Sequence, residues 1–227
     1  MKGDGGGVRG RQAAGTPTHP ALLAAFPGWS AALDEAWTAY LCGSYPIGAV
    51  VVDAGGEVIA RGRNRLGEAR GVEGGAISGH DLAHAEINAL LDLREVPRPD
   101  AHGWTVLTTV QPCPQCAGAI AMSGLRAVEY AAPDPWAGCT RLLTDDPYVS
   151  RKKIRVGRAP EAVQSAALRL ALVGFLDSGT TPETPVMRSF AVHAGDFDRA
   201  LRLHRAGTLR TLRALGAGLD EALAVLA

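Results

Sequence analysis

Residues 105–131 constrain the fold more than any other part of this 227-residue chain. A β-branched run at 105–110 is followed by a helix of small residues over about 114–123 and then by a second apolar run at 127–131. This order predicts two parallel strands joined by a right-handed crossover. With 47% hydrophobic and 20% charged residues, the chain can bury a sizeable core. We therefore expect an α/β layered domain.

The residues before this unit predict a helix and a hairpin. A helix over about 31–42 would place Leu33, Trp37 and Leu41 on one face, with Ser30 as its N-cap. Two apolar runs flank an Asp-Ala-Gly-Gly turn and should pair as antiparallel strands, which makes the sheet mixed. The expected strands, a following loop and a second helix lie at 47–52, 57–61, 64–80 and about 84–93.

Composition divides the chain into three parts. Residues 1–20 are rich in glycine and proline and predict a flexible tail. The layered domain is expected over 21–150, and helical patterns predict a C-terminal helical extension over 151–227. Residues 1–150 hold 11 Lys and Arg against 16 Asp and Glu, whereas the extension holds 12 against 7. Any nucleic-acid contact would therefore fall more naturally on the extension.

Cysteine content and hydropathy indicate the compartment. Four cysteines, two of them within one Cys-x-x-Cys motif, favour a reducing environment. No apolar run approaches the roughly 18 residues that a membrane span needs. The polar, glycine-rich N-terminus does not resemble a signal peptide. We expect a cytoplasmic protein without a membrane partner.

Two motifs carry the chemistry, namely His-Ala-Glu at 84–86 and Pro-Cys-Pro-Gln-Cys at 112–116. Catalytic zinc sites use three protein ligands and leave the fourth position to water, which the metal acidifies. Glu86 is near enough to take a proton from that water and to deliver it to a departing amino group. Both motifs should open helices, whose N-termini favour thiolates. The candidate ligands are His84, Cys113 and Cys116.

Two other interpretations of the motifs are a redox pair and a structural zinc site. A Cys-x-x-Cys redox pair needs no His-Ala-Glu upstream. A closed structural zinc site needs a fourth ligand, and the only nearby spare imidazole is His80, which we expect in the loop. The pattern His-x-Glu followed by Pro-Cys-x-x-Cys is typical of zinc deaminases that act on nucleobases. A catalytic zinc site is therefore favoured.

These motifs resemble the cytidine and deoxycytidylate deaminase superfamily, in particular its bacterial branch of tRNA-adenosine, guanine and related nucleobase deaminases. The resemblance implies a three-layer α/β/α sandwich with a mixed five-stranded sheet, the cytidine deaminase-like fold, and a homodimer. It assigns Zn²⁺ to the three candidate ligands and the proton shuttle to Glu86. The matching stretches lie within about 30–145, at 46–52, 62–65, 84–90 and 111–120.

The resemblance also implies contacts to a substrate. Asn64 corresponds to an asparagine that hydrogen-bonds the substrate ring, and the alternative is an ordinary turn residue. The backbone of Ala85 and Cys113 would lie near the reactive water. Asp134 could accept from a ring N–H or amino group, and Trp136 could stack on a base. Packing against the start of a helix is an equal alternative for Trp136.

Two features depart from the family pattern. Gln111 stands where the family usually has glutamate, which removes a charge beside the cysteine helix. The helical region after about residue 150 has no counterpart that we recognise in the compact tRNA enzyme. The amide would alter packing at the site or a contact with a partner, and the C-terminal helices would help to shape substrate choice, which the sequence leaves open.

The expected activity is that of a zinc-dependent hydrolase acting on C–N bonds of cyclic amidines. It would convert an exocyclic amine of a free nucleobase, nucleoside or related aminated heterocycle to a carbonyl and release ammonia. The alternative is adenosine-to-inosine deamination in tRNA, with the basic extension holding phosphates. A third hypothesis is a non-catalytic zinc fold that acts as a binding module, and the intact Glu86 disfavours it.

Overall fold

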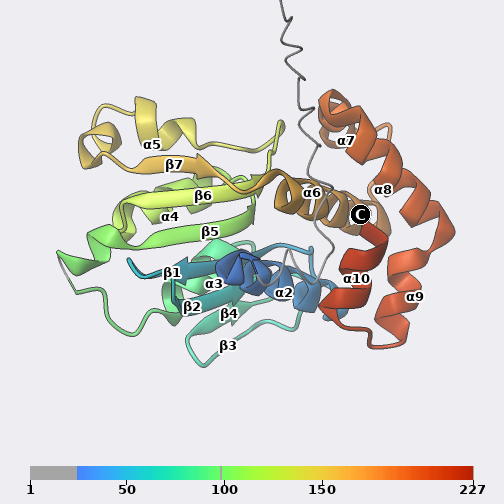
Figure 1. The fold of residues 1–227 in the computed structure, drawn as a ribbon, viewed down its shortest axis with the longest axis horizontal. Coiled ribbons are helices and arrows are strands. Elements are labelled where there is room, and N and C mark those ends of the chain that lie inside the picture. Colours follow the sequence, from blue (N-terminus) through green and yellow to red (C-terminus); the bar gives the residue numbers. More distant parts are fainter. Residues whose placement is uncertain (1–24, 98, 227) are drawn as a thin grey trace, which may run out of the picture.

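The computed structural model describes residues 25–97 and 99–226, so the predicted tail at 1–20 lies outside the described residues. Its centre is a five-stranded sheet with the order β2-β1-β5-β6-β7 (Figure 1). Strand β1 is antiparallel to both of its neighbours, β2 and β5, whereas β5, β6 and β7 run parallel to one another. The predicted mixed sheet is confirmed. The strands are β1 (Gly48–Val52), β2 (Val58–Arg63), β5 (Thr105–Val110), β6 (Ala127–Ala132) and β7 (Arg155–Arg158).

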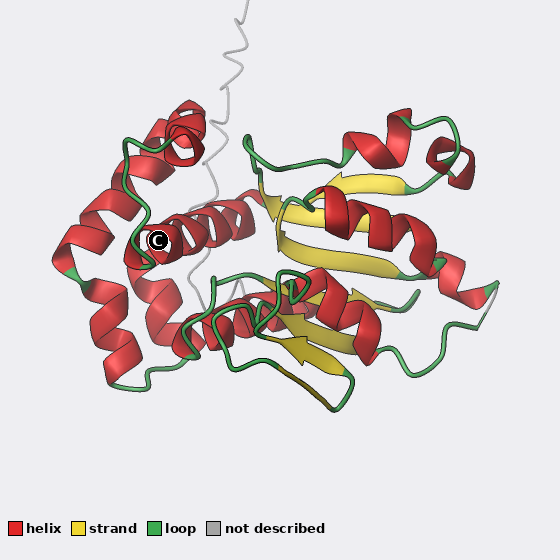
Figure 2. Cartoon of the chain, turned by 180° about the vertical axis from the view of Figure 1, so that it is seen from behind, coloured by secondary structure: helices red, strands yellow, loops and turns green. Residues whose placement is uncertain are grey.

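Helices cover both faces of the sheet. Side chains of α2 (Pro27–Leu41) and α6 (Glu161–Asp177) share one apolar core with alternate residues of β1, such as Val50. The other face holds α3 (Ala85–Asp92), α4 (Pro114–Ser123) and α5 (Arg141–Asp145), whose core includes Val51. Figure 2 shows this second face turned toward the viewer. All of β1 is buried, as a strand covered on both faces should be. The three-layer α/β/α fold is confirmed.

Two glycines let helices pack directly against the β1–β2 hairpin. A Cβ on Gly48 would lie 2.1 Å from Ala32 O of α2, and a Cβ on Gly62 would lie 2.1 Å from Ala89 N of α3. No side chain fits at such distances, so the helix backbones rest on the strands. This contact fixes where α3 begins, and α3 begins at the His-Ala-Glu motif.

Two local predictions need correction. Ser30 is not the N-cap of α2, because Pro27 takes the first helical position and the Ser30 N–H already donates to Phe26 O. The region expected as a loop at 64–80 contains a small hairpin of β3 (Gly71–Glu73) and β4 (Ala76–Ser78). Gly74 and Gly75 form its turn with positive φ angles, which glycine adopts without strain.

The strand β7 lies inside the segment that the sequence assigned to the helical extension. It has four residues, carries arginine at both ends and is largely exposed, so it lacks the apolar pattern of a strand. The helices that follow α6 in the same segment pack on α2 and α6 (Figure 1). The Trp37 indole of α2, for instance, donates to Ala217 O at 2.8 Å. The helices are α7 (Pro185–Ser189), α8 (Ala194–Ala206), α9 (Thr208–Ala214) and α10 (Leu219–Leu226).

The described residues also include three short 3₁₀ turns, η1 (Asp100–Gly103), η2 (Val149–Lys152) and η3 (Phe190–His193). Within the described ranges, no helix has the length and apolar character that crossing a membrane requires.

Replacing Gly48 by alanine tests the close packing of α2. We expect Gly48→Ala to lower the free energy of unfolding by about 1–3 kcal/mol or more, because the new methyl group meets helix backbone. Gly118→Ala is the matched control, since a Cβ there meets nothing within 4 Å and alanine favours the helix. Urea unfolding of the two variants measures the difference. Equal stability would contradict the packing argument.

Candidate metal and catalytic site

The structure brings the three predicted ligands together at two helix N-termini. His84 is the N-cap of α3, Cys113 is the N-cap of α4, and Cys116 lies in the first turn of α4. His84 Nδ1 lies 3.6 Å from Cys113 Sγ and 3.4 Å from Cys116 Sγ. All three ligand atoms lie within 4.8 Å of one another. The expected placement of both motifs at helix starts is confirmed.

These distances fit a tetrahedral zinc site. Bonds of about 2.3 Å to sulfur and about 2.05 Å to nitrogen place two tetrahedral ligand atoms about 3.6 Å apart. The measured separations of 3.4 and 3.6 Å agree with that value. His80 does not join the group, because its Nδ1 accepts from Leu82 N–H at 3.1 Å. Three ligands among the described residues leave one tetrahedral position for water, as in catalytic zinc sites.

Backbone hydrogen bonds hold the two motifs in place. The Arg65 N–H donates to Ala83 O at 3.0 Å, which fastens the segment after β2 beside His84. The Cys139 N–H donates to Pro112 O at 2.8 Å, which fastens the loop after β6 beside Cys113. Loops from separate strands thus converge on the ligands at one edge of the sheet.

Glu86 lies in the first turn of α3 and is 4% exposed. Its Oε2 lies 3.3 Å from Cys116 Sγ, so the carboxylate borders the metal ligands. Burial raises its pKa above the usual range. A carboxyl group with a raised pKa, held beside a candidate metal, can both accept and release a proton.

The ligands tune one another electrostatically. The hydrogen bond from the Cys116 thiol lowers the pKa of Cys113 to about 4, and that bond together with burial raises the pKa of Cys116. The hydrogen bond to Cys113 also raises the pKa of His84. A divalent cation held by these residues would favour the thiolate form of both sulfurs.

Asn64 follows β2 and is buried, with 2% of its surface exposed. Its Oδ1 accepts from Leu66 N–H at 3.0 Å, so the side chain does shape a turn. Its backbone N–H donates to Ile47 O at 2.9 Å. The turn uses only the amide oxygen, and the amide also carries two N–H donors. A turn role and a substrate contact are thus compatible at Asn64.

Asp134 and Trp136 share the loop after β6. Asp134 Oδ1 accepts from the N–H groups of Trp136 and Ala137, both at 2.9 Å, so this oxygen shapes the loop itself. Trp136 is 59% exposed. An indole so exposed is not buried against a helix start. Ala85, the first residue of α3, is fully buried.

Gln111 has a structural role that the sequence did not reveal. Its Oε1 accepts from Asp134 N–H at 3.1 Å, and its Nε2 donates to Thr140 Oγ1 at 2.8 Å. One amide thus joins both ends of the loop that carries Trp136, just before Cys113. The only sequence signal was the departure from the family's usual glutamate at this position.

The part of the chain that holds this site is similar to known proteins. Residues 28–132 match the cytidine and deoxycytidylate deaminase zinc-binding region. A tRNA(Ile)-lysidine synthase of Deinococcus radiodurans is 33% identical over 185 residues, which cover 78% of this chain and 29% of that protein. A tRNA-specific adenosine deaminase of Bacillus subtilis is 37% identical over 114 residues, 49% of this chain and 64% of that protein.

A cytosine deaminase of Candida albicans is 28% identical over 120 residues, 52% of this chain and 73% of that protein. The chain spans less than two thirds of the length of the lysidine synthase and of the tRNA-specific adenosine deaminase. The match at 28–132 contains every candidate ligand, and the donor set with its spacing identifies Zn²⁺ as the cofactor. Residues 28–132 belong to the zinc-binding region of the cytidine and deoxycytidylate deaminase family.

Proposed function

We propose that this protein hydrolyses an exocyclic amine on a small nucleobase-like heterocycle, giving a carbonyl compound and ammonia. The observation that carries the proposal is the buried carboxylate of Glu86 beside three convergent metal ligands. A structural zinc site has no use for a buried carboxyl group at that position. Zinc-dependent hydrolytic deamination uses it as the proton carrier.

Each site residue has a definite role in this reaction. His84, Cys113 and Cys116 hold the zinc, which when bound supplies the Lewis acidity that lets water attack near neutral pH. Glu86 accepts a proton from the attacking water and passes it to the leaving nitrogen. A C–O bond forms, the C–N bond breaks, and the amine departs as ammonia.

Three regions around the metal site would recognise the heterocycle. Asn64 would hydrogen-bond its edge through the amide N–H groups that the Leu66 turn does not use. Trp136 would stack on its face from the loop that Gln111 holds. Asp134 would accept from an N–H of the ring through its second carboxylate oxygen, and the backbone of Ala85 would border the reactive water.

Charge favours a small substrate over a nucleic acid at this site. Residues 1–150, which include every proposed site residue, carry a net charge of −5. Such a surface repels a phosphate backbone, whereas a neutral base or nucleoside experiences little repulsion. The cytosine deaminase relative acts, by its name, on a free base.

Adenosine in tRNA is the second candidate. The lysidine synthase and the adenosine deaminase described above are both named for tRNA, and the match to the lysidine synthase extends beyond residues 28–132. The segment 151–227 carries a net charge of +5 and could hold phosphates. The homodimer, the cytoplasmic location and the assignment of 21–150 as the deaminase unit stay predictions.

Replacing Glu86 tests the proton-transfer role. We expect Glu86→Gln to lower kcat/KM by about 10²–10⁴-fold, because an amide cannot carry the proton. Zinc content, measured by elemental analysis, should stay at one per chain. The assay measures ammonia from a panel of purines, pyrimidines and triazines. Unchanged turnover in the variant, or no ammonia from any substrate with the wild-type protein, would refute the proposal.

Removing a ligand tests the metal site. We expect Cys116→Ala to lose zinc and activity together, because two remaining ligands cannot hold the ion with catalytic affinity. Cys42→Ala is the matched control, since Cys42 is exposed at the end of α2 and lies outside the ligand group. Elemental analysis of both variants gives the answer. Full zinc content in Cys116→Ala would exclude this ligand set.

A pair of charge changes separates the two substrates. Arg202 and Arg205 are exposed on α8. If tRNA is the substrate, replacing both by glutamate should weaken tRNA binding and reduce its salt dependence. If the substrate is small, we expect deamination by the double variant to equal that of the wild type, and no gel shift of tRNA even at low salt. A salt-dependent shift with tRNA deamination would favour the second candidate.

A further inference from the structure

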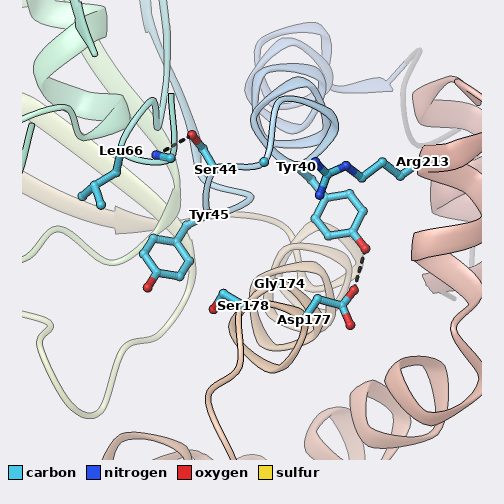
Figure 3. A pocket seen from close by; sticks show the side chains of 10 residues that line it. Tyr40, Ser44, Tyr45, Leu66, Gly174, Asp177, Ser178 and Arg213 are labelled. Carbon is cyan, nitrogen blue, oxygen red and sulfur yellow. Dashed lines mark hydrogen bonds between the residues drawn. The ribbon is translucent and has the colours of Figure 1, made fainter. Parts of the chain in front are cut away.

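A pocket of about 200 Å³ lies between the ends of α2 and α6 and the helix α9 (Figure 3). None of the described metal-site residues lines it. Its volume is below the roughly 300–1,000 Å³ of pockets for drug-sized ligands, so it suits one small group. Its polar lining consists of Tyr40, Ser44, Tyr45, Asp177, Ser178 and Arg213.

The only acid in this lining is already neutralised. Asp177 Oδ2 accepts from the Tyr40 hydroxyl at 2.5 Å, and its Oδ1 lies 2.6 Å from His204 Nδ1 and forms an ion pair with Arg210. Its side chain is only 9% exposed. With three partners around one carboxylate, Asp177 offers little attraction to a cation.

Arg213 is the cation in the lining, and it has no acidic partner. Its guanidinium lies 5.6 Å from the centre of the Tyr40 ring, reaching across from α9 (Figure 3). No ion pair joins it to any acid in the described ranges 25–97 and 99–226. A guanidinium presents a planar fork of donors that matches the oxygens of carboxylate and phosphate groups.

The turn after α2 contributes Gly43 and Ser44 to the lining. A Cβ on Gly43 would lie 3.2 Å from Arg213 Nη2, so the glycine lets the guanidinium approach the turn after α2. Ser44 Oγ accepts from Gly67 N–H at 3.0 Å, which leaves its own O–H to donate. Arg210 and Arg213 against Asp177 give the pocket region one net positive charge.

We propose that this pocket binds a small anionic group, a phosphate or a carboxylate, with Arg213 as its principal ligand. The site is built by the C-terminal helices as much as by the layered domain, since Arg213 comes from α9 and Tyr40 from α2. This gives the C-terminal helices a ligand-binding role distinct from the metal chemistry.

The pocket shares a wall with the candidate substrate site. Leu66 and Gly67 line it, and the Leu66 N–H donates to Asn64 Oδ1. The backbone N–H of the neighbouring Arg65 donates to Ala83 O, and Ala83 directly precedes His84. An anion in the pocket can therefore belong to the substrate, as the phosphate of a nucleotide, or to a separate small ligand.

Binding of inorganic phosphate by titration calorimetry tests the site. We expect wild-type protein to bind phosphate, and Arg213→Gln to weaken binding by about tenfold, the loss of one charge-assisted contact. Arg188→Gln, an equal charge change on an exposed residue outside the pocket, should bind as the wild type does. Thermal unfolding checks that both variants fold. No phosphate binding to the wild type, or equal binding to Arg213→Gln, would overturn the proposal.

This test does not depend on the proposed reaction, because the inactive Glu86→Gln protein serves equally well for it. A second arm identifies the source of the anion by comparing the KM for a nucleoside with that for its 5′-monophosphate. A preference for the monophosphate that disappears in Arg213→Gln assigns the anion to the substrate. Phosphate binding that depends on Arg213 without such a preference assigns it to a separate ligand.

Discussion

The direct contact between helix backbone and sheet at Gly48 and Gly62 governs the rest of the structure. Because neither position has a side chain, α2 and α3 lie on opposite faces of the β1–β2 hairpin with their backbones against it. The N-terminus of α3 is thereby set at a fixed height above the sheet. His84 can meet Cys113 and Cys116 within ligand distance only if that height is correct.

The metal site also depends on which edge of the sheet its loops occupy. The parallel strands β5 and β6 end at the same edge, and the loops after them carry Cys113 and Trp136. The antiparallel strand β1 begins there, and β2 ends there with Asn64 immediately after it. Antiparallel and parallel pairing in one sheet thus brings together four loops that are far apart in sequence. Chemistry at such an edge is varied by changing loops without altering the core.

The sequence predicted the fold where the pattern was strong and the elements local. The crossover at 105–131 and the helix starts at His84 and Cys113 depend on short-range signals, namely periodicity and a proline at a first helical turn. The three metal ligands could also be predicted, because a zinc site requires nitrogen and sulfur donors of this kind. By contrast, β7 pairs through backbone alone, and its arginine-rich sequence gives no apolar signal.

Features that depend on tertiary contacts could not be read from the sequence. Gln111 joins both ends of a loop whose course is set only by the folded chain. Arg213 reaches Tyr40 across 173 positions of sequence, because α9 folds back on α2. The β3–β4 hairpin, by contrast, could have been predicted from the sequence. Its Gly-Gly turn is a recognisable hairpin signal, although the surrounding region has no regular pattern.

The arginines of the two outer strands also bear on the behaviour of the protein in concentrated solution. β7 carries Arg155 and Arg158, so its margin of the sheet is positively charged, whereas the two arginines of β2 form ion pairs with Glu35 and Glu68. An open margin has unpaired backbone groups that could recruit a strand from another molecule. The arginines of β7 oppose such pairing at their margin, so this edge is protected from becoming a template for aggregation.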